Sequence, residues 1–273
     1  TRNRANLIQD SINSIVRQDN GEIEIVVVDG GSSDGTSDIL ATYAKSLPYF
    51  SYFLRGEGVG VDRDVVKASH LARGKFIWFF SDDDILEDGA IVRISLELFR
   101  NAGLTGMSIN IQAFDQKMRY GIKTVPSSSG NSIRCDAVFT DVHECYSKMA
   151  LHLGFLSGQI VNRELWLNAL SVRPPSDMYN NWLLVYVLGR VMLDDKALAW
   201  YYMSSPLIRY RSGNDSFSKN GMLARQYITH NAFADTIAQL FSRDSATYSN
   251  VMKTLLVDRM PRTLAMIKAD GAS

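Results

Sequence analysis

Apolar positions in the first third of the chain switch between a helical and an extended period. Residues 4–18 carry apolar side chains at helical spacing, and Gly21 follows as a stop signal. Residues 22–29 (EIEIVVVD) form a β-branched run that ends in the glycine-rich turn GGSSDGT. The same periods predict a helix through 39–44, a strand over 49–54, a helix over 65–72 and a strand over 76–80. This alternation predicts an α/β fold, with a mostly parallel central sheet flanked by helices and functional loops at the carboxyl ends of the strands.

Beyond residue 90 the spacing of apolar residues follows the helical and extended periods less clearly. We expect a helix over 91–99, a strand over 107–114, a loop over the Ser-, Gly- and Pro-rich stretch 125–132, and a mainly helical tail from about Leu223. Three further stretches have the composition of ordered segments: 155–166, 174–192 and 204–217.

The candidate chemistry centres on the stretch FIWFFSDDDILED, residues 76–88. Its apolar run predicts a strand buried on both faces, and Asp82, Asp83 and Asp84 follow where that strand leaves the sheet. Adjacent ionised carboxylates repel one another, and a raised pKa, exposure to solvent or a bound cation relieves the repulsion. Asp29 also ends a strand, so in a parallel sheet it faces the same rim. The competing interpretation is a solvated acidic turn that caps the following helix.

Composition narrows the class of protein. The chain has 273 residues, of which 46% are hydrophobic, which is enough for one large globular domain or two small ones. Lys plus Arg and Asp plus Glu number 29 each, so no overall charge favours a nucleic acid as partner. Cys135 and Cys145 are too few for a disulfide scaffold, and we expect a reducing, cytoplasmic setting. No apolar run reaches the ~20 residues needed to span a bilayer, so any membrane contact is expected to be peripheral.

Other motifs compete for the chemistry. The pentapeptide GSSDG, residues 31–35, fits the G-x-S-x-G pattern of a hydrolase with Ser33 as nucleophile, but a structural turn is the favoured interpretation. A hydrolase would need a later acid and one of the remaining histidines, His143, His152 and His230. The loop GEGVG, residues 56–60, lacks the last glycine of a dinucleotide-binding loop. The stretch DDDILED lacks the glycine and glutamate spacing of an EF-hand calcium loop. The metal interpretation that remains is a hard cation, Mg²⁺ or Mn²⁺, bound by the aspartate cluster.

Several motifs together resemble a known family. The segments TRNR, EIVVVDGGSSDGT and DRDVVKASHLARGKFIWFFSDDD resemble, in order and spacing, the family 2 glycosyltransferases with the GT-A fold. DRDVVKA and the late YRSGNDSF are similar to the branch that includes abequosyltransferases and related polysaccharide sugar transferases. The resemblance covers about residues 1–90 well and the rest sparsely. It implies one GT-A domain with a nucleotide-sugar-binding half (1–105), an acceptor-binding and catalytic half (106–218), and a C-terminal helical extension (219–273).

The resemblance also implies roles at the nucleotide end of the site. Thr1 and Arg4 match the loop that lines the nucleotide pocket, in which Arg2 replaces a tyrosine. Asp29 matches the acid that binds the nucleotide base, and Gly30 stands where the family commonly has a second aspartate.

At the diphosphate end, Arg63 lies where the family often places a basic residue. Asp82 or Asp83 is expected to contact the ribose or donor sugar, and Asp84 to bind the metal. This role predicts that Asp84→Ala removes metal-dependent donor binding and leaves the fold intact.

The second half of the chain supplies the remaining candidates. The resemblance implies a general base on an aspartate before a helix, for which Asp177 in PPSDMYNNW is the candidate. A helix N-cap or a loop acid is the competing interpretation, and Asp194 and Asp195 are weaker alternatives. In relatives the late segment folds over the pyrophosphate, which gives Arg209, Arg211 and Asn214 substrate-binding roles beside surface ones.

The resemblance implies a metal-dependent, inverting glycosyltransferase of bacterial surface polysaccharide synthesis. Its partners would be a nucleotide-diphospho-sugar donor and a saccharide or lipid-linked saccharide acceptor, with the protein in the cytoplasm or at the inner face of the membrane. The alternative is a non-catalytic nucleotide-sugar or glycan-binding module of the same fold.

The first residue raises one further expectation. In the family a buried strand precedes the T-x-N-R motif in the middle of the sheet, and its absence would leave unpaired backbone groups in an apolar interior. We therefore expect the natural protein to continue upstream of Thr1 with a short apolar strand, the alternative being that another segment of the chain fills this slot. Direct pairing of residues 24–28 with 76–80 would contradict this expectation and the roles given to Thr1 and Arg4.

Overall fold

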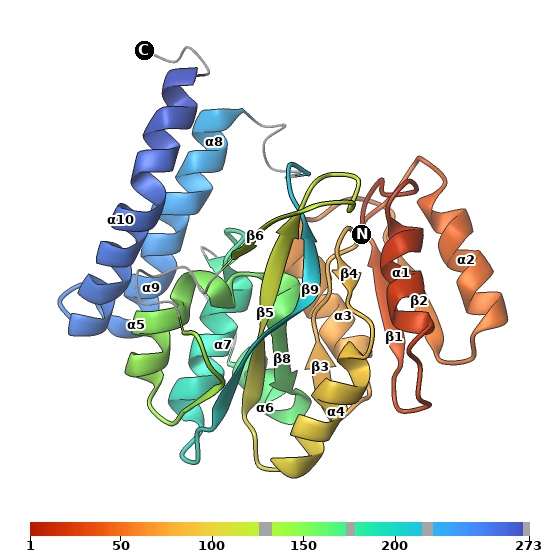
Figure 1. Cartoon of the computed structure of the whole chain (residues 1–273), viewed down its shortest axis with the longest axis horizontal. Helices are drawn as coiled ribbons and strands as arrows, with labels where there is room; N and C mark the ends of the chain where they lie inside the picture. Colours follow the sequence, from red (N-terminus) through yellow and green to blue (C-terminus); the bar gives the residue numbers. More distant parts are fainter. Residues whose placement is uncertain (126–132, 173–177, 215–220, 270–273) are drawn as a thin grey trace.

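The computed structural model describes residues 1–125, 133–172, 178–214 and 221–269. Helices cover a central sheet, with α1 and α2 at one end of the molecule and the C-terminal helices at the other (Figure 1). The predicted loop 125–132 lies outside the described residues, apart from Val125, which ends a strand.

The N-terminal end is a small α/β unit. Its elements are α1 (Ile8–Val16), β1 (Ile25–Asp29), α2 (Thr36–Ser46), β2 (Phe50–Leu54) and α3 (Val61–Leu71). β1 and β2 pair in parallel, as the alternation of periods predicts. Ile8, Ile12, Leu40 and Phe50 form a buried cluster under the two helices, so apolar burial fixes both helices to this sheet.

The larger sheet has seven strands: β3 (Phe76–Trp78), β4 (Ile85–Leu86), β5 (Gly106–Phe114), β6 (Gly121–Val125), β7 (Ala137–Phe139), β8 (Gln159–Asn162) and β9 (Trp200–Arg211). The main strand order is β3-β8-β5-β9-β4, with β6 paired to β5 and β7 to β9. The α/β fold and its central sheet are therefore confirmed. The expectation of mostly parallel pairing is wrong for this sheet, because only β5 and β9 pair in parallel. β8 lies antiparallel between β3 and β5, which a strand pattern in the sequence does not reveal.

β3 is covered on both faces, as its apolar run predicts. Ile77 and Phe79 are buried in the cluster formed with the helices of the second half. Phe76, Trp78 and Phe80 pack against the cluster on the opposite face, under α4 (Ala90–Arg100). The alternation fixes which way the chain points when it leaves the sheet.

β1 and β3 belong to separate sheets and share no pairing in the described structure. The backbone of Thr1 lies beside the end of β1 instead, because its nitrogen donates to the Val28 carbonyl (2.8 Å) and its carbonyl accepts from the Gly30 N–H (2.8 Å). The pairing that would contradict the roles of Thr1 and Arg4 is thus not found.

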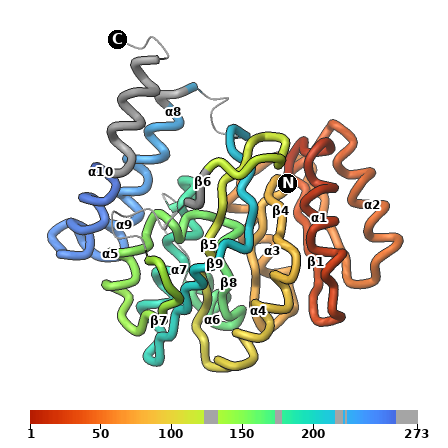
Figure 2. The backbone as a smooth tube through the Cα atoms, in the orientation of Figure 1, coloured from red at the N-terminus to blue at the C-terminus, as the bar shows by residue number. Residues whose placement is uncertain are grey.

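The second half packs its helices on one face of the sheet and ends in a helical arm. These helices are α5 (Val142–Leu153), α6 (Arg163–Ser171), α7 (Leu183–Asp194), α8 (Met222–Tyr227), α9 (Phe233–Phe241) and α10 (Ala246–Ala269). Figure 2 traces α8 and α10 as an arm at the end of the molecule opposite α1 and α2. The expected helical tail is confirmed. In the described part of the chain, no helix is both long and apolar enough to cross a membrane.

One turn of π-helix, Ile228–Ala232, joins α8 to α9. Side chains satisfy the carbonyls that this widened turn exposes: the Trp182 indole N–H donates to Ile228 O (2.7 Å), and the Asn180 amide donates to Ala232 O (3.2 Å). The start of α7 is therefore tied to the C-terminal arm.

His152 generates a prediction about acid stability. Its ring is buried, contacts the Ile109 carbonyl (Nε2 to O, 3.0 Å), and has its pKa lowered by burial to about 4 from 6.5. The unfolded chain takes up this proton below about pH 6.5 and the folded chain only below about pH 4, so stability is lost as the pH falls through this window. We expect the stability advantage of the wild type over His152→Gln to shrink by about 3 kcal/mol between about pH 7 and pH 4.

Urea denaturation across this range measures the effect. His70→Gln serves as control, because His70 is exposed. A His152→Gln difference that stays constant with pH would contradict the prediction.

Candidate functional site

The turn after β3 places its three carboxylates in different environments. Asp84 is 1% exposed, whereas Asp82 and Asp83 are half-buried. Asp84 Oδ2 accepts from the Ser157 hydroxyl (2.7 Å) and Oδ1 from the Arg211 backbone N–H (3.2 Å). Burial, and next the charge of Asp83, raise the pKa of Asp84 to about 7, against the effect of these two hydrogen bonds. Asp84 thus joins the turn to β8 and to the end of β9, and both of its oxygens already have protein donors.

Asp82 and Asp83 form the accessible part of the cluster. Arg4 Nε lies 3.4 Å from Asp82 Oδ1, and both side chains keep some exposure, 16% and 18%. The Asn214 amide donates to Asp83 Oδ2 (2.8 Å) and accepts from Arg4 Nη1 (3.1 Å). The N-terminal loop, the turn after β3 and the segment after β9 therefore meet at this point.

Arg211 is held inside the protein. Its side chain is 5% exposed, and its guanidinium donates to the Asp83 carbonyl (2.9 Å) and the Gln116 carbonyl (2.6 Å). The third contact is with Asp10 Oδ2, at 3.3 Å. Such burial suits a residue that positions the acidic turn better than one that contacts substrate. Arg209 is engaged as well, in a two-point ion pair with Glu87 (2.7 Å for both contacts).

Asp29 lies on the same edge of the molecule as the acidic turn. The Thr1 backbone bonds to both neighbours of Asp29, and the Thr1 nitrogen is 4.0 Å from Asp82 Oδ2. Asp29 and the 82–84 cluster are thus linked through Thr1, but not as neighbours on the rim of one parallel sheet, because β1 and β3 belong to separate sheets. Asp29 itself is fully buried and accepts from the Ser32 N–H (2.9 Å), the Ser32 hydroxyl (2.6 Å) and the Ser37 hydroxyl (2.6 Å). It organises the glycine-rich turn.

Arg55, in the loop after β2, and Asp64, in α3, form a pair that the sequence did not indicate. Arg55 Nε lies 2.7 Å from Asp64 Oδ1, and Arg55 N–H donates to the Asp29 carbonyl (2.9 Å). A Cβ atom placed on Gly30 would lie 3.0 Å from Asp64 Oδ2. The only signal in the sequence is the glycine at position 30, which leaves room for a group from elsewhere.

Arg63, next to this pair, is not brought to the carboxylates. Its side chain is exposed, and its guanidinium lies 4.9 Å from the centre of the Tyr179 ring. The Arg63 carbonyl accepts from Arg55 Nη2 (3.0 Å). In this conformation Arg63 points toward the second half of the chain.

The candidate general base Asp177 lies outside the described residues. Its alternatives do not fit that role. Asp194 pairs with Arg190 on the surface of α7 (3.0 Å), and Asp195 accepts from the Thr105 hydroxyl (2.6 Å) beside the start of β5. The acidic turn is held near the other end of β5, which excludes Asp195 from its chemistry.

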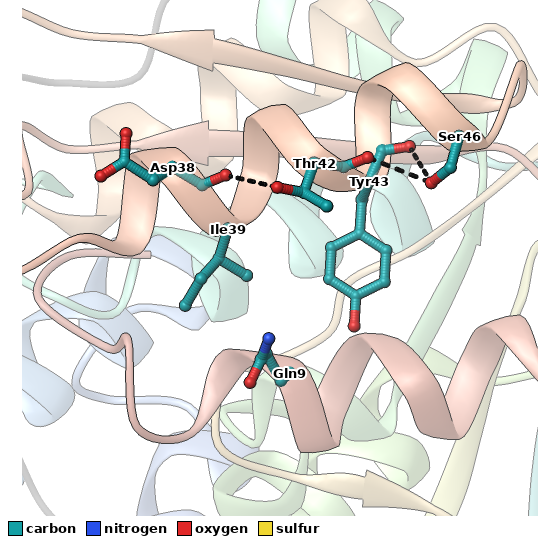
Figure 3. Close-up of a pocket in the computed structure, with 6 residues that line it drawn as sticks. All are labelled: Gln9, Asp38, Ile39, Thr42, Tyr43 and Ser46. Atoms are coloured by element: carbon teal, nitrogen blue, oxygen red, sulfur yellow. Dashed lines mark hydrogen bonds between the residues drawn. The ribbon is translucent and has the colours of Figure 1, made fainter.

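The hydrolase interpretation finds no support. Ser33 is exposed, its backbone N–H donates to Asn3 Oδ1 (2.8 Å), and its described contacts include no histidine. A groove of about 410 Å³ between α1 and α2, lined by Ile39 and Tyr43 among others, also contains none of the clustered carboxylates (Figure 3).

A cation at the acidic turn would need oxygen ligands from a bound molecule. Within the described ranges, no three His, Cys, Asp or Glu side chains are grouped as a metal site. Hard cations in phosphate-binding sites commonly take one or two carboxylates, with waters and phosphate oxygens as the other ligands. Asp82 and Asp83 can supply such a partial set.

Known glycosyltransferases are similar to this chain in sequence and in fold. The sequence profile described as glycosyl transferase family 2 matches residues 1–151. The abequosyltransferase RfbV of Salmonella typhimurium is 26% identical, over 97% of this chain and 81% of its own. Staphylococcus aureus TarS 1–349 has a similar fold, with TM-score 0.65 at 15% identity over 96% of this chain and 71% of its own. So has the mannosyltransferase PcManGT of Pyrobaculum calidifontis, solved with GDP-Man and Mn²⁺ (TM-score 0.55, 15% identity, 98% and 82% covered).

Asp84 generates a prediction about stability that differs from the expectation drawn from sequence. Because Asp84→Ala leaves the Ser157 hydroxyl and the Arg211 N–H without their acceptor, we expect it to lower the free energy of unfolding by about 1–3 kcal/mol. The isosteric Asp84→Asn keeps an acceptor and should lose less. Urea denaturation measures both, with Asp88→Ala as control, because Asp88 is 82% exposed. An Asp84→Ala variant as stable as the wild type would contradict the structural role.

Proposed function

The chain belongs to glycosyl transferase family 2, and we propose on this premise that it transfers a sugar from a nucleoside diphosphate donor to a saccharide acceptor in bacterial surface polysaccharide synthesis. The carrying observation is the meeting of Arg4, Asn214 and the half-buried Asp82 and Asp83 at one edge of the sheet. A complex of a metal cation with a diphosphate needs both negative and positive partners. Asp82 and Asp83 supply negative charge for the cation, and Arg4 supplies positive charge for the diphosphate. The named activities of RfbV and PcManGT support the reaction class. The acceptor is free or lipid-linked, and in the second case the protein works at the membrane surface.

We place the metal on Asp83 rather than on Asp84. Asp83 keeps some exposure, and its partners, the Asn214 amide and the Ser81 hydroxyl, are neutral groups that can turn away. Asp84 is buried, and a cation would have to displace two protein donors from it. The chemistry of this donor set fits Mn²⁺ or Mg²⁺, and PcManGT with Mn²⁺ supports the choice. When bound, such a cation stabilises the negative charge of the leaving diphosphate.

The chain's own residues orient the donor around this point. Arg4 is partly exposed and lies beside Asp82 (Nε to Oδ1, 3.4 Å), and exchanging Asp82 for a diphosphate oxygen would keep its charge paired. Buried hydrogen bonds fix the acidic turn: the Arg211 backbone N–H donates to Asp84, and its guanidinium donates to the Asp83 carbonyl. A ligand can bind Asp82 and Asp83 without breaking these bonds. The buried pair therefore fixes the direction in which Asp82 and Asp83 point.

Asp177 stays the proposed general base for the acceptor hydroxyl, which implies a single displacement with inversion. The residues that follow it support this role. The Asn181 backbone N–H donates to Asp62 Oδ2 (2.7 Å), and Tyr179 packs against Arg63. The segment after Asp177 is thus anchored on α3, which also carries Asp64.

The metal assignment gives a test of this function. We expect Asp83→Ala to weaken Mn²⁺-dependent binding of the donor nucleotide by about tenfold or more, because a carboxylate ligand to the cation is lost. Isothermal titration with UDP, CDP and GDP, with and without Mn²⁺, measures it, and Asp88→Ala is the control. Unchanged Mn²⁺ dependence in Asp83→Ala would refute the ligand role. Donor binding without nucleoside diphosphate release for any donor and acceptor pair would favour a non-catalytic sugar-binding module instead.

A further inference from the structure

Asp64 occupies the space beside Gly30 that a side chain at position 30 would need. Any Cβ atom at position 30 would lie 3.0 Å from Asp64 Oδ2, 3.5 Å from the Thr1 carbonyl and 3.8 Å from Arg2 Cβ. The backbone of Gly30 is not in the left-handed region, so conformation alone does not demand a glycine there. A larger residue would crowd the carboxylate that α3 brings to this point, and Asp64 would have to shift by a few tenths of an ångström.

The two carboxylates nearest this space differ in what they can still bind. Asp29 is fully buried, and both of its oxygens accept hydrogen bonds from Ser32 and Ser37. Asp64 is 18% exposed, and its Oδ2 accepts no hydrogen bond from any described residue. A ligand N–H entering here would therefore find its acceptor on Asp64 and not on Asp29.

Arg55 holds Asp64 in place and gives this corner of the site its hydrogen-bonding character. The pair is close (Nε to Oδ1, 2.7 Å) and half-buried, with side chains 23% and 18% exposed. The Arg55 backbone N–H donates to the Asp29 carbonyl and its guanidinium donates to the Arg63 carbonyl, which fixes Arg55 to the end of β1 and to α3. A neutral acid–base pair neither attracts nor repels a phosphate strongly, but it presents an acceptor beside a donor, which matches the edge of a nucleobase.

The order of groups along the edge points the same way. From the acidic turn the contacts run from Asp82 to Thr1 and from Thr1 to Gly30, and Asp64 Oδ2 lies 3.0 Å from the position of a Cβ atom on Gly30. These neighbours link the acidic turn to Asp64. A nucleoside diphosphate that lies along them with its diphosphate at Asp83 would bring its base to Asp64.

We propose that Asp64, held by Arg55 beside Gly30, is the carboxylate that recognises an N–H of the donor's nucleobase. This inference rests on the proposed function, since it assumes a nucleoside diphosphate in the site. A purely structural pair is the competing explanation, although partly exposed ion pairs contribute little to stability.

Moving the carboxylate from α3 to position 30 tests the proposal. We expect Asp64→Ala to bind the preferred nucleoside diphosphate, chosen among UDP, CDP and GDP with Mn²⁺, about tenfold or more weakly than the wild type. Binding of ribose 5-diphosphate, which has no base, should change by less than about twofold. Gly30→Asp alone should also bind poorly, because its Cβ meets Asp64 Oδ2. The double variant Gly30→Asp/Asp64→Ala should recover most of the lost affinity, because its new carboxylate enters the space that Asp64 vacates.

Three results would overturn the proposal: an unchanged nucleotide affinity in Asp64→Ala, an equal loss for both ligands, or no recovery in the double variant. Thermal unfolding checks each variant, and Asp64→Asn replaces Asp64→Ala if the latter does not fold. Asp38→Ala, an exposed acid of α2, is the matched control. A wild type that binds no nucleoside diphosphate would instead refute the proposed function itself, so the two failures are distinguishable.

Discussion

Three carboxylates on consecutive residues lie at one edge of the sheet. Cationic and amide side chains from distant parts of the sequence offset their negative charge. Arg4 approaches from the N-terminal loop, while Arg211 and Asn214 arrive from the end of β9. Repulsion among Asp82, Asp83 and Asp84 would otherwise favour their separation or protonation. The position of the N-terminal unit relative to the larger sheet is tied to these contacts, because they connect the two directly.

The three carboxylates differ in burial, and their roles differ accordingly. Asp84 is buried and stabilises the turn. Its burial, together with the charge of Asp83, raises its pKa. Asp82 and Asp83 keep enough exposure to meet a ligand. The same division recurs beside the glycine-rich turn, where Asp29 is fully buried with serine donors on both oxygens and Asp64 Oδ2 accepts from none of the described residues. In both places a buried acid shapes the backbone, and its half-exposed neighbour is left for binding.

Sequence reasoning worked where the signal is local. The periods of α1 and β1, the strand β3 with its two covered faces, and the helical tail are each determined by neighbouring residues, and all are found. Antiparallel β8 between β3 and β5 was missed, because strand direction depends on connections that a short apolar run does not encode. The burial of Asp84 and Arg211 was missed for a related reason: their partners lie 73 and 128 residues away in the chain. Asp64 could have been suspected only from the glycine at position 30.

The central claim is that the half-exposed acids at this edge, and not the buried ones, hold the donor. Anomalous X-ray scattering from Mn²⁺ in a crystal grown with a nucleoside diphosphate tests it most directly. We predict a metal peak about 2 Å from a carboxylate oxygen of Asp83, with the base at hydrogen-bonding distance from Asp64. A metal bound directly by Asp84, or a nucleotide whose base contacts Asp29 while Asp64 faces only Arg55, would contradict it.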